Sequence, residues 1–340
     1  MSTLKDVAEK ANVSLMTVSR VVNGQFDKVS SKTREKVEKA ILELQYVPNF
    51  SARALSTKDS KIVALIMYCN GNRLRDPYIA EMCDGIIDNL QKEGYYTLVC
   101  ALDSPENVTK YLRTWNTDGA IFLGDFDAWI PDIKKQNHIP LIFTDSYLEQ
   151  RLASNVGIDD YKGGVLAANH FLSAGHVEFA FVSFEENGPK DEKKSSQVMK
   201  KRLQGFRDTL GNNGFFLKDS HCFLNLPPEK TAKQLKKLLP SLTAVFVCSD
   251  QLAISVMGFL QELDVSIPED ISVIGFDNTP SSSIISPKLT TVAQNIMEKA
   301  AHTSKLLLNQ MEKNNLSSLN IILDVELLPR DSVKKIEKKR

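Results

Sequence analysis

The chain has 340 residues, of which 42% are hydrophobic and 25% charged, and its formal net charge is zero. This composition is typical of a soluble globular protein. The balanced charge excludes a protein that binds polyanions over its whole surface. The length is large for one domain and predicts two or three.

Cysteine usage and hydropathy exclude further classes. The five cysteines are scattered and include no C-x-x-C pair, so neither a metal site nor a disulfide framework is predicted. No basic-then-apolar signal segment opens the chain, and no apolar run approaches the ~18–20 residues of a membrane span. We therefore expect a cytoplasmic protein with no membrane partner, no metal and no cofactor.

Residues 3–24 predict two short helices joined by a turn. Ser14 precedes the second helix, where its hydroxyl can accept an unpaired first-turn amide, and Asn23-Gly24 can close that helix with positive φ. Such a pair is either a helix-turn-helix, whose second helix enters the DNA major groove, or a hairpin in another all-α domain. Spacing alone leaves both readings open. The apolar residues at helical spacing are Val7, Ala8 and Ala11, then Val18, Val21 and Val22.

A third helix is predicted over Lys32–Leu44, with Ser30 or Ser31 as its cap. Its apolar stripe would complete a three-helix core, and Val47-Pro48 ends this domain because the residue before proline avoids α geometry. We therefore assign residues 1–47 to an all-α headpiece. Residues 1–60 hold ten basic and seven acidic side chains, a mild positive excess.

From Ser60 onward, short apolar runs alternate with helical patterns. Near-continuous apolar strands separated by helices are typical of parallel sheets covered on both faces. The runs are too many for one compact sheet, so residues 60–333 predict two α/β lobes, with ligands bound beyond the carboxyl ends of the strands. Expected strands are Ile62–Met67, Thr97–Leu102, Ala120–Leu123, Leu141–Thr144, Glu178–Ser183, His221–Leu224, Ala244–Cys248 and Ile271–Phe276; expected helices are Ile79–Glu93, Val108–Trp115, Lys162–Ala174, Met199–Gly211, Lys230–Leu239 and Gln251–Leu263.

Enzyme signatures are missing. The sequence contains no G-x-x-x-x-G-K-S/T, G-x-G-x-x-G, H-E-x-x-H or G-x-S-x-G pattern, and its five histidines have no ligand spacing. Gly163-Gly164 opens a helix, but two glycines are a weak phosphate signal. We therefore predict no catalytic residue and no enzyme. A solute-binding protein would share the two lobes, but the headpiece and the missing signal segment argue against it.

Five blocks of residues at fixed spacing resemble a known family: Thr3-Leu4-Lys5-Asp6-Val7-Ala8, Val13-Ser14, Thr17-Val18-Ser19-Arg20-Val21-Val22-Asn23-Gly24, Tyr46-Val47-Pro48-Asn49 and Ala52-Arg53-Ala54-Leu55. They resemble the N-terminal signature of the lac-repressor (LacI/GalR) family of bacterial transcription regulators, and the resemblance extends along nearly the whole chain. It implies an α/β fold class: an N-terminal all-α helix-turn-helix headpiece plus a two-lobed, periplasmic-binding-protein-like α/β effector domain. It also implies three lobe crossings, near residues 160, 291 and 321.

The resemblance makes residues 48–58 a hinge helix and linker. The helix-prone part, Asn49–Ser56, is too short to be stable alone in water. In the family this segment orders when two subunits sit side by side on DNA. Leu55 matches the leucine that enters the minor groove and kinks the duplex. The alternative is that Leu55 packs on the domain below.

The resemblance also implies the DNA contacts. Arg20 is the candidate for direct readout, because a guanidinium can grip guanine O6 and N7. Leu15 and Met16 occupy the specificity positions and can select only by shape and by thymine methyl groups; for Met16, simple packing is the alternative. Phosphate or sugar would be contacted by the hydroxyls of Ser14, Thr17 and Ser19 and by the side-chain amide of Asn23. The full predicted set is Thr3, Ser14, Leu15, Met16, Thr17, Ser19, Arg20, Asn23, Asn49, Ala52, Arg53 and Leu55.

Polar residues at strand ends are the candidates for effector binding. Asp145, Ser249 and Asp277 each follow a predicted strand, and a carboxylate can accept two sugar hydroxyls at once. Asp145, Arg202, Asp277 and Gln294 match the pocket positions of the family, whereas Ser249 stands where many members have asparagine. Each aspartate could instead cap the following helix, which is the preferred reading for Asp250.

Effector identity transfers least from the resemblance. Residues 68–75 are about four residues longer than the common family spacing and would roof the cleft. Within the family a carbohydrate or sugar phosphate is the commonest effector and a purine the runner-up. An aromatic floor for a sugar ring could come from Trp115, Phe126, Trp129 and Tyr147, although core packing suits most of them better.

Assembly is the last expectation. The charged tail, residues 334–340, lacks the leucine heptads that make some family members tetramers, so a homodimer is expected. Two headpieces in successive major grooves require a pseudo-palindromic double-stranded DNA operator. The sequence thus indicates a repressor, and it leaves open whether its effector is an inducer or a corepressor.

Overall fold

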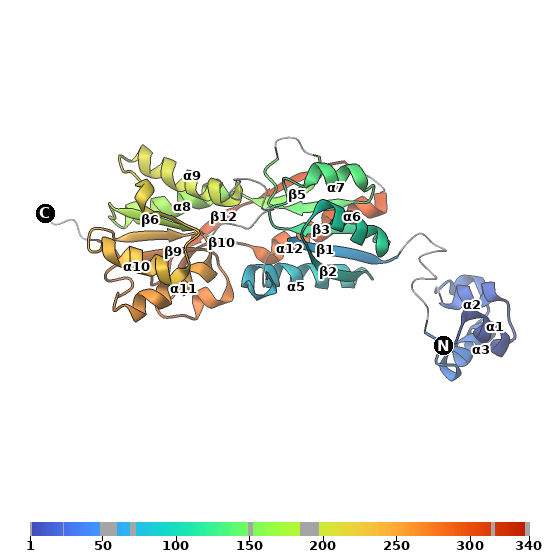
Figure 1. The fold of residues 1–340 in the computed structure, drawn as a ribbon. Coiled ribbons are helices and arrows are strands. Elements are labelled where there is room, and N and C mark those ends of the chain that lie inside the picture. Colours follow the sequence, from blue (N-terminus) through green and yellow to red (C-terminus); the bar gives the residue numbers. More distant parts are fainter. Residues whose placement is uncertain are drawn as a thin grey trace. The chain divides into compact units, whose positions relative to one another are not determined.

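The computed structural model describes residues 2–22, 24–47, 60–68, 73–148, 152–183, 197–313 and 317–336. The chain divides into two compact units, residues 1–61 and 62–340 (Figure 1). The predicted fold class is confirmed: the first unit is all-α, and the second contains two β-sheets covered by helices. Among the described residues, no helix is long and apolar enough to cross a bilayer.

The described part of the first unit holds the helices α1 (Leu4–Ala11), α2 (Leu15–Val22) and α3 (Ser31–Glu43), with a 3-10 turn η1 (Phe26–Lys28). Caps define their starts: Thr3 and Asp6 form a capping box on α1, and Ser30 caps α3. The apolar stripes meet in one core. Its buried members are Val7, Ala8, Ala11, Val18, Val21, Val37, Ala40 and Tyr46.

The first lobe of the second unit is a parallel sheet in the order β11-β5-β4-β3-β1-β2. Successive β1 side chains point to opposite faces, so one set packs under α5 and α12 and the other under α6 and α7. Its strands are β1 (Ile62–Tyr68), β2 (Tyr96–Leu102), β3 (Gly119–Leu123), β4 (Leu141–Thr144), β5 (Ser154–Ile158) and β11 (Asn320–Leu323). Its helices are η2 (Arg73–Arg75), α5 (Pro77–Lys92), α6 (Pro105–Thr114), α7 (Ile130–Gln136) and α12 (Ile296–Lys313).

The second lobe has the sheet order β12-β10-β9-β8-β6-β7, parallel except for β12. Helices α8 and α9 cover one face and α10 and α11 the other. Its strands are β6 (Phe179–Ser183), β7 (Cys222–Leu224), β8 (Ala244–Val247), β9 (Ser272–Asp277), β10 (Thr290–Gln294) and β12 (Val325–Leu328). Its helices are α8 (Asp160–Ser173), α9 (Gln197–Asn212), η3 (Asp219–His221), α10 (Pro228–Leu238), α11 (Asp250–Glu262) and η4 (Pro280–Ser283).

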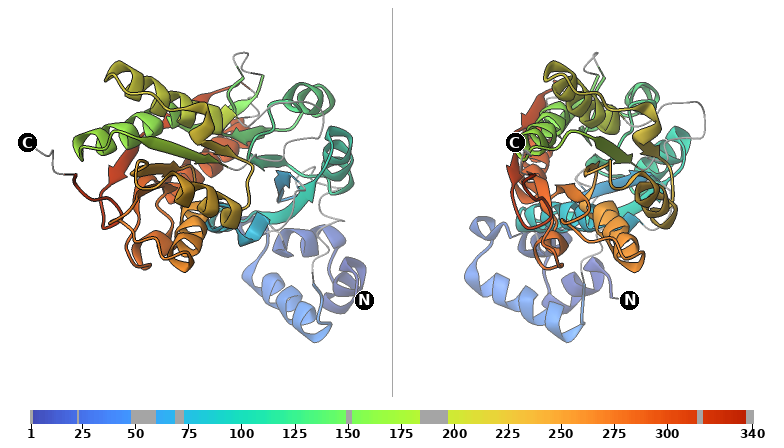
Figure 2. Two further views of the ribbon diagram at one scale, coloured as in Figure 1. Left: turned by 60° about the vertical axis from the view of Figure 1, so that its left-hand side comes forward. Right: turned by 90° about the vertical axis from the view of Figure 1, so that its left-hand side faces the viewer.

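The chain passes between the two sheets at Asp159, Asn295 and Asp324. The second passage follows β10, so the residues near 291 that were expected to cross are a strand of the second sheet. As a result α12, drawn in red, lies in the first lobe although it follows the strands of the second (Figure 1). Figure 2 shows α8, in green, beside α9, in yellow.

Helix α12 is missing from the predicted set. Its sequence carries an apolar stripe that includes Ile296, Ala300 and Leu307, but polar residues share that buried face. These residues are nonetheless buried, because each makes a local or long-range bond: Thr303 donates to the Lys299 carbonyl, Ser304 to the Ala300 carbonyl, and Gln310 to the Ser154 hydroxyl. Helix α12 also carries Lys299, whose ammonium contacts Asp145 in the cleft.

Candidate nucleic-acid interface and effector cleft

The second helix of the headpiece presents two large apolar side chains to solvent. Leu15 is 49% exposed and Met16 64% exposed, in the first turn of α2. Simple packing of Met16 within the headpiece does not fit this exposure. Thr17, Ser19 and Arg20 are half-buried on the same helix. The exposed pair therefore gives α2 an apolar tip that could meet thymine methyl groups.

The predicted hydroxyl contacts also have roles within the headpiece. The Ser14 hydroxyl accepts from the Thr17 amide at 3.2 Å, which caps α2. Thr3 accepts from the Asp6 amide at 3.3 Å, and the bonds that Thr3 donates lower the pKa of Asp6. Five predicted DNA contacts lie outside the described residues: Asn23, Asn49, Ala52, Arg53 and Leu55.

The structure brings all five predicted effector residues around one cavity of about 60 Å³. They come from both lobes and from strand ends, as the carboxyl edges of parallel sheets allow. Asp145 follows β4 of the first lobe. The other four belong to the second lobe: Arg202 on α9, Ser249 after β8, Asp277 at the end of β9 and Gln294 at the end of β10.

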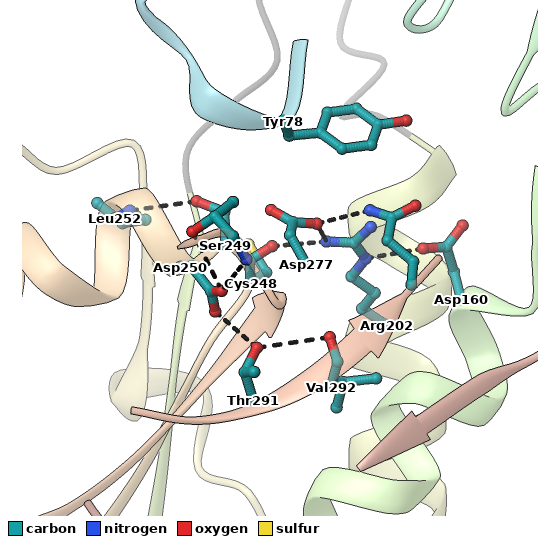
Figure 3. Close-up of polar contacts among 12 residues, drawn as sticks. Tyr78, Asp160, Arg202, Cys248, Ser249, Asp250, Leu252, Asp277, Thr291 and Val292 are labelled. Atoms are coloured by element: carbon teal, nitrogen blue, oxygen red, sulfur yellow. Dashed lines mark hydrogen bonds and ion pairs between the residues drawn. The ribbon is translucent and has the colours of Figure 1, made fainter. Parts of the chain in front are cut away.

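Arg202 is the centre of the second-lobe side of the cleft (Figure 3). Its Nε donates to Asp160 Oδ1 at 2.7 Å, its Nη1 donates to the Cys248 carbonyl at 2.6 Å, and Asp277 Oδ1 lies 3.9 Å from Nη1. The guanidinium stacks 3.4 Å from the ring centroid of Phe276. Burial opposes the charge, but Asp160 and Asp277 outweigh it and raise the pKa of Arg202. Arg202 therefore remains a fixed cation.

Asp145 and Asp277 share an unusual backbone. Both have positive φ, 59° and 111°, although neither is glycine. Such conformations cost about 1–3 kcal/mol and gather at ligand sites. Asp277 accepts from Gln294 Nε2 at 2.7 Å, and burial raises its pKa well above the ordinary value. The positive φ values show that the surrounding structure holds both aspartates in a conformation that few residues adopt.

Ser249, not Asp250, caps the helix after β8. The Ser249 hydroxyl accepts from the Leu252 amide at 3.2 Å (Figure 3). Asp250 instead accepts from the Thr279 amide at 2.8 Å and from the Thr291 hydroxyl at 2.6 Å. The capping role preferred for Asp250 is therefore wrong, because its carboxylate points back toward the sheet. Burial raises the pKa of Asp250 to about 6.

Three cleft residues were missed by the sequence reasoning: Tyr78, Asp160 and Lys299. The Lys299 Nζ lies 2.6 Å and 2.8 Å from the two carboxylate oxygens of Asp145 and 2.9 Å from the Tyr78 hydroxyl. Burial raises the pKa of Tyr78, and the nearby charge of Asp145 raises it further. The available signal was spacing, since Lys299 falls on the buried stripe of α12 with Ile296 and Thr303.

The candidate aromatic floor is mostly core. Phe126 and Trp129 are buried in the first lobe and pack edge to face, with ring centroids 5.5 Å apart. Trp115 is half exposed and lies against Tyr111 on α6. Only Tyr147 reaches the cleft, where its hydroxyl donates to Asp160. Core packing was the preferred role for most of these residues.

A larger groove of about 450 Å³ lies beside the start of α12. Its lining includes the carboxylates of Glu81, Glu298, Asp324 and Glu326. Among the described parts of the chain, no three potential metal ligands converge. The smaller cleft is the better candidate for an effector site, because charges of both signs and several hydrogen-bonding groups converge there from two lobes.

A helix-turn-helix unit joined to two parallel-sheet lobes around a polar cleft defines the architecture of a regulatory protein with a ligand-binding domain. Comparison with known proteins agrees. Residues 3–49 match the bacterial regulatory proteins of the lacI family, and residues 168–333 match the periplasmic binding protein-like domain.

The chain belongs to the lacI family. It is 31% identical to the HTH-type transcriptional regulator DegA of Bacillus subtilis (strain 168), over 97% of this chain and 98% of that protein. It resembles the lac repressor dimer bound to operator and the anti-inducer ONPF, with 26% identity, a TM-score of 0.84 and coverage of 98% and 99%. A CelR–cellobiose complex matches with 26% identity, a TM-score of 0.71 and coverage of 98% and 100%. These relatives are transcriptional regulators and not enzymes, as expected.

Proposed function

We propose that this chain is a sequence-specific, DNA-binding transcriptional repressor whose grip on DNA is set by a small molecule bound between its lobes. The observation that carries the proposal is the cleft: five polar side chains from separate elements of both lobes converge on one cavity. The family assignment supplies the DNA-binding half. The two halves together describe an effector-controlled regulator.

In this proposal α2 enters the major groove. Arg20 reads guanine through two parallel hydrogen bonds, and the exposed Leu15 and Met16 contact base edges by shape. The hydroxyls of Ser14, Thr17 and Ser19, with Thr3 and Asn23, contact the sugar–phosphate backbone. Residues 48–58 form the hinge: Asn49, Ala52 and Arg53 contact DNA, and Leu55 enters the minor groove.

The proposed active form is a homodimer on a pseudo-palindromic operator. Two headpieces about one helical turn apart require a twofold-symmetric site. The lac repressor, which this chain resembles, was crystallised as a dimer bound to operator. The effector would close the cleft and change the spacing of the two hinges. If effector weakens operator binding by some factor, operator weakens effector binding by the same factor.

A carbohydrate is the proposed effector class. Carboxylates and a guanidinium are the groups that bind sugar hydroxyls, since they accept and donate paired hydrogen bonds. The cleft holds both in Asp145, Asp277 and Arg202. The similarity to CelR, whose complex contains the sugar cellobiose, supports the same ligand class. A screen of sugars, sugar phosphates and nucleobases by thermal shift tests this class, because a ligand that binds only the native state raises its melting temperature.

The DNA half is tested by Arg20→Ala. Operator DNA is first selected from a random pool with the wild-type chain, and affinities for operator and random duplexes are then compared at one salt concentration. We expect the variant to lose about 1–3 kcal/mol of discrimination at one base pair. Lys36→Ala removes an exposed charge on α3 and serves as control. An unaltered ratio of operator to random binding in Arg20→Ala would refute the readout role.

A further inference from the structure

The polar groups of the cleft contact one another in a continuous series, which we call the cleft ring because its two ends lie on the same loop. It begins and ends on the loop after β4, with Asp145 and Tyr147, and passes through both lobes. The successive contacts are Asp145–Lys299 at 2.6 Å, Lys299–Gln294 at 3.5 Å, Gln294–Asp277 at 2.7 Å, Asp277–Arg202 at 3.9 Å, Arg202–Asp160 at 2.7 Å and finally Asp160–Tyr147.

Lys299 is the member of the ring that has an unusual position. Its side chain is only 1% exposed, and its ammonium contacts both oxygens of Asp145. Asp145 Oδ2 also accepts from the Tyr78 hydroxyl at 3.3 Å. A buried ammonium is tolerated because a carboxylate neutralises it. Both oxygens of Asp145 thus already accept at least one hydrogen bond within the protein.

The Lys299 ammonium occupies the position at Asp145 that a hydrogen-bond donor of a ligand would take. A carboxylate only accepts hydrogen bonds, so whatever replaces Lys299 at Asp145 must also donate. The hydroxyl groups of a sugar can do this, whereas a fully ionised phosphate group can only accept. The Lys299 stem has four rotatable carbons and can withdraw without moving the backbone of α12.

The charge balance points the same way. Among the described residues that line the cavity or pair with its lining, five are carboxylates and two are cations. Each cation already has a partner, Asp145 for Lys299 and Asp160 for Arg202. Among these residues a phosphate would therefore find no unpaired cation to receive it. The carboxylates are Asp76, Asp125, Asp145, Asp160 and Asp277.

The volume of the cavity favours opening of the cleft ring. A cavity of about 60 Å³ has room for only a few water molecules. A sugar ring therefore needs more space than this cavity offers, and breaking contacts of the cleft ring is one way to provide it. Asp145 lines the cavity from the first lobe and its partner Lys299 has a flexible side chain, so this is the contact that we expect to exchange.

We propose that Lys299 acts as an internal stand-in for the effector, occupying Asp145 until the hydroxyl groups of an unphosphorylated carbohydrate displace it. The inference rests on the proposed function, because it concerns the effector of the same cleft. It narrows the effector from sugars and sugar phosphates to unphosphorylated sugars. It also makes Lys299 a specificity-determining residue, because an effector must bind Asp145 more strongly than the Lys299 ammonium does.

The test compares matched sugar pairs on the full-length chain. D-ribose, D-glucose and cellobiose, each paired with a phosphate ester, and inorganic phosphate are measured by thermal shift and calorimetry at equal ionic strength. We expect a sugar to stabilise the wild type and its ester not to do so. Lys299→Met should tighten the binding of that sugar about tenfold, the equivalent of one charge-assisted hydrogen bond that no longer has to be broken.

Controls separate folding from recognition. Lys305→Met removes an exposed lysine from the same helix and should leave sugar affinity unchanged. Lys299→Met leaves Asp145 buried without a counter-ion, so the double variant Lys299→Met/Asp145→Asn provides a neutral pair if the single variant does not fold. In the double variant, the sugar should bind more weakly than to Lys299→Met, because the carboxylate acceptor is gone.

Two results overturn the proposal. If a phosphate ester or inorganic phosphate stabilises the wild type more than the parent sugar, and Lys299→Met loses that effect, Lys299 anchors an anion. If no unphosphorylated sugar binds, the assigned ligand class is wrong. Operator binding is measured in parallel on the same samples. Loss of operator binding counts against the proposed function, whereas intact operator binding confines the failure to this inference.

Discussion

The crossing of α8 and α9 gives the sharpest test of how the cleft is built. A Cβ atom added at Gly205 would lie 2.0 Å from the Tyr161 carbonyl oxygen, and one at Gly164 would lie 2.1 Å from the Arg202 carbonyl oxygen. Ordinary contact begins at 3.4 Å, and both obstacles are backbone atoms. No side-chain rotation relieves such an overlap, so Gly205→Ala must push the two helices apart.

The expected cost of Gly205→Ala follows from this geometry. Overpacking a core costs typically about 1–3 kcal/mol, and backbone obstacles place this site near the upper value. Arg202 lies one turn before Gly205 on α9, and its 2.7 Å bond joins it to Asp160 at the start of α8. Separating the helices therefore also stretches a buried ion pair. We expect the free energy of unfolding to fall by about 3 kcal/mol or more.

Urea unfolding followed by circular dichroism measures this change. Gly211→Ala is the matched control, because Gly211 lies on the same helix and an added Cβ meets nothing within 4 Å. It should leave stability unchanged or raise it by up to about 1 kcal/mol, since alanine favours helix. If the two variants were equally stable, the close approach of α8 and α9 would not hold the cleft together.

Two further predictions concern pH and helix capping. The folded pKa of Asp250, about 6, exceeds the ordinary aspartate value of 3.8, so its contribution to stability is present below pH 4 and lost as pH rises through about 6. Urea titrations of Asp250→Asn should lack a loss of about 3 kcal/mol that the wild type shows over that interval; parallel pH profiles would contradict this. Thr3→Ala should destabilise α1 by about 1 kcal/mol, measured by hydrogen exchange of its amides without DNA, whereas Thr3→Ser should keep the cap. Equal exchange in both variants would remove the capping role.

Sequence patterns predicted the elements whose signals are local. The capped headpiece helices and the apolar strands from Ile62 to Phe276 follow from residue spacing within each segment. Strands β5, β10, β11 and β12 and helices α7 and α12 were not predicted as elements. Their sequences mix polar and apolar residues, and their partners lie far along the chain; β11, for example, pairs with β5. Tertiary pairing, rather than local preference, decides such segments.

The candidate effector residues divide in the same way. Strand ends and family spacing were enough to predict Asp145, Arg202, Ser249, Asp277 and Gln294, because the carboxyl edge of a parallel sheet collects them. Neither source could show which of these groups are already occupied.

Local spacing thus determined which segments form helices and strands and which side chains stand at their ends. Only the tertiary structure decided the partners: Lys299 meets Asp145 across 154 positions, and Arg202 meets Asp160 across 42. The physical reason is that a charged side chain can be buried only beside an oppositely charged partner. Which partner lies there depends on how the chain passes between the two lobes.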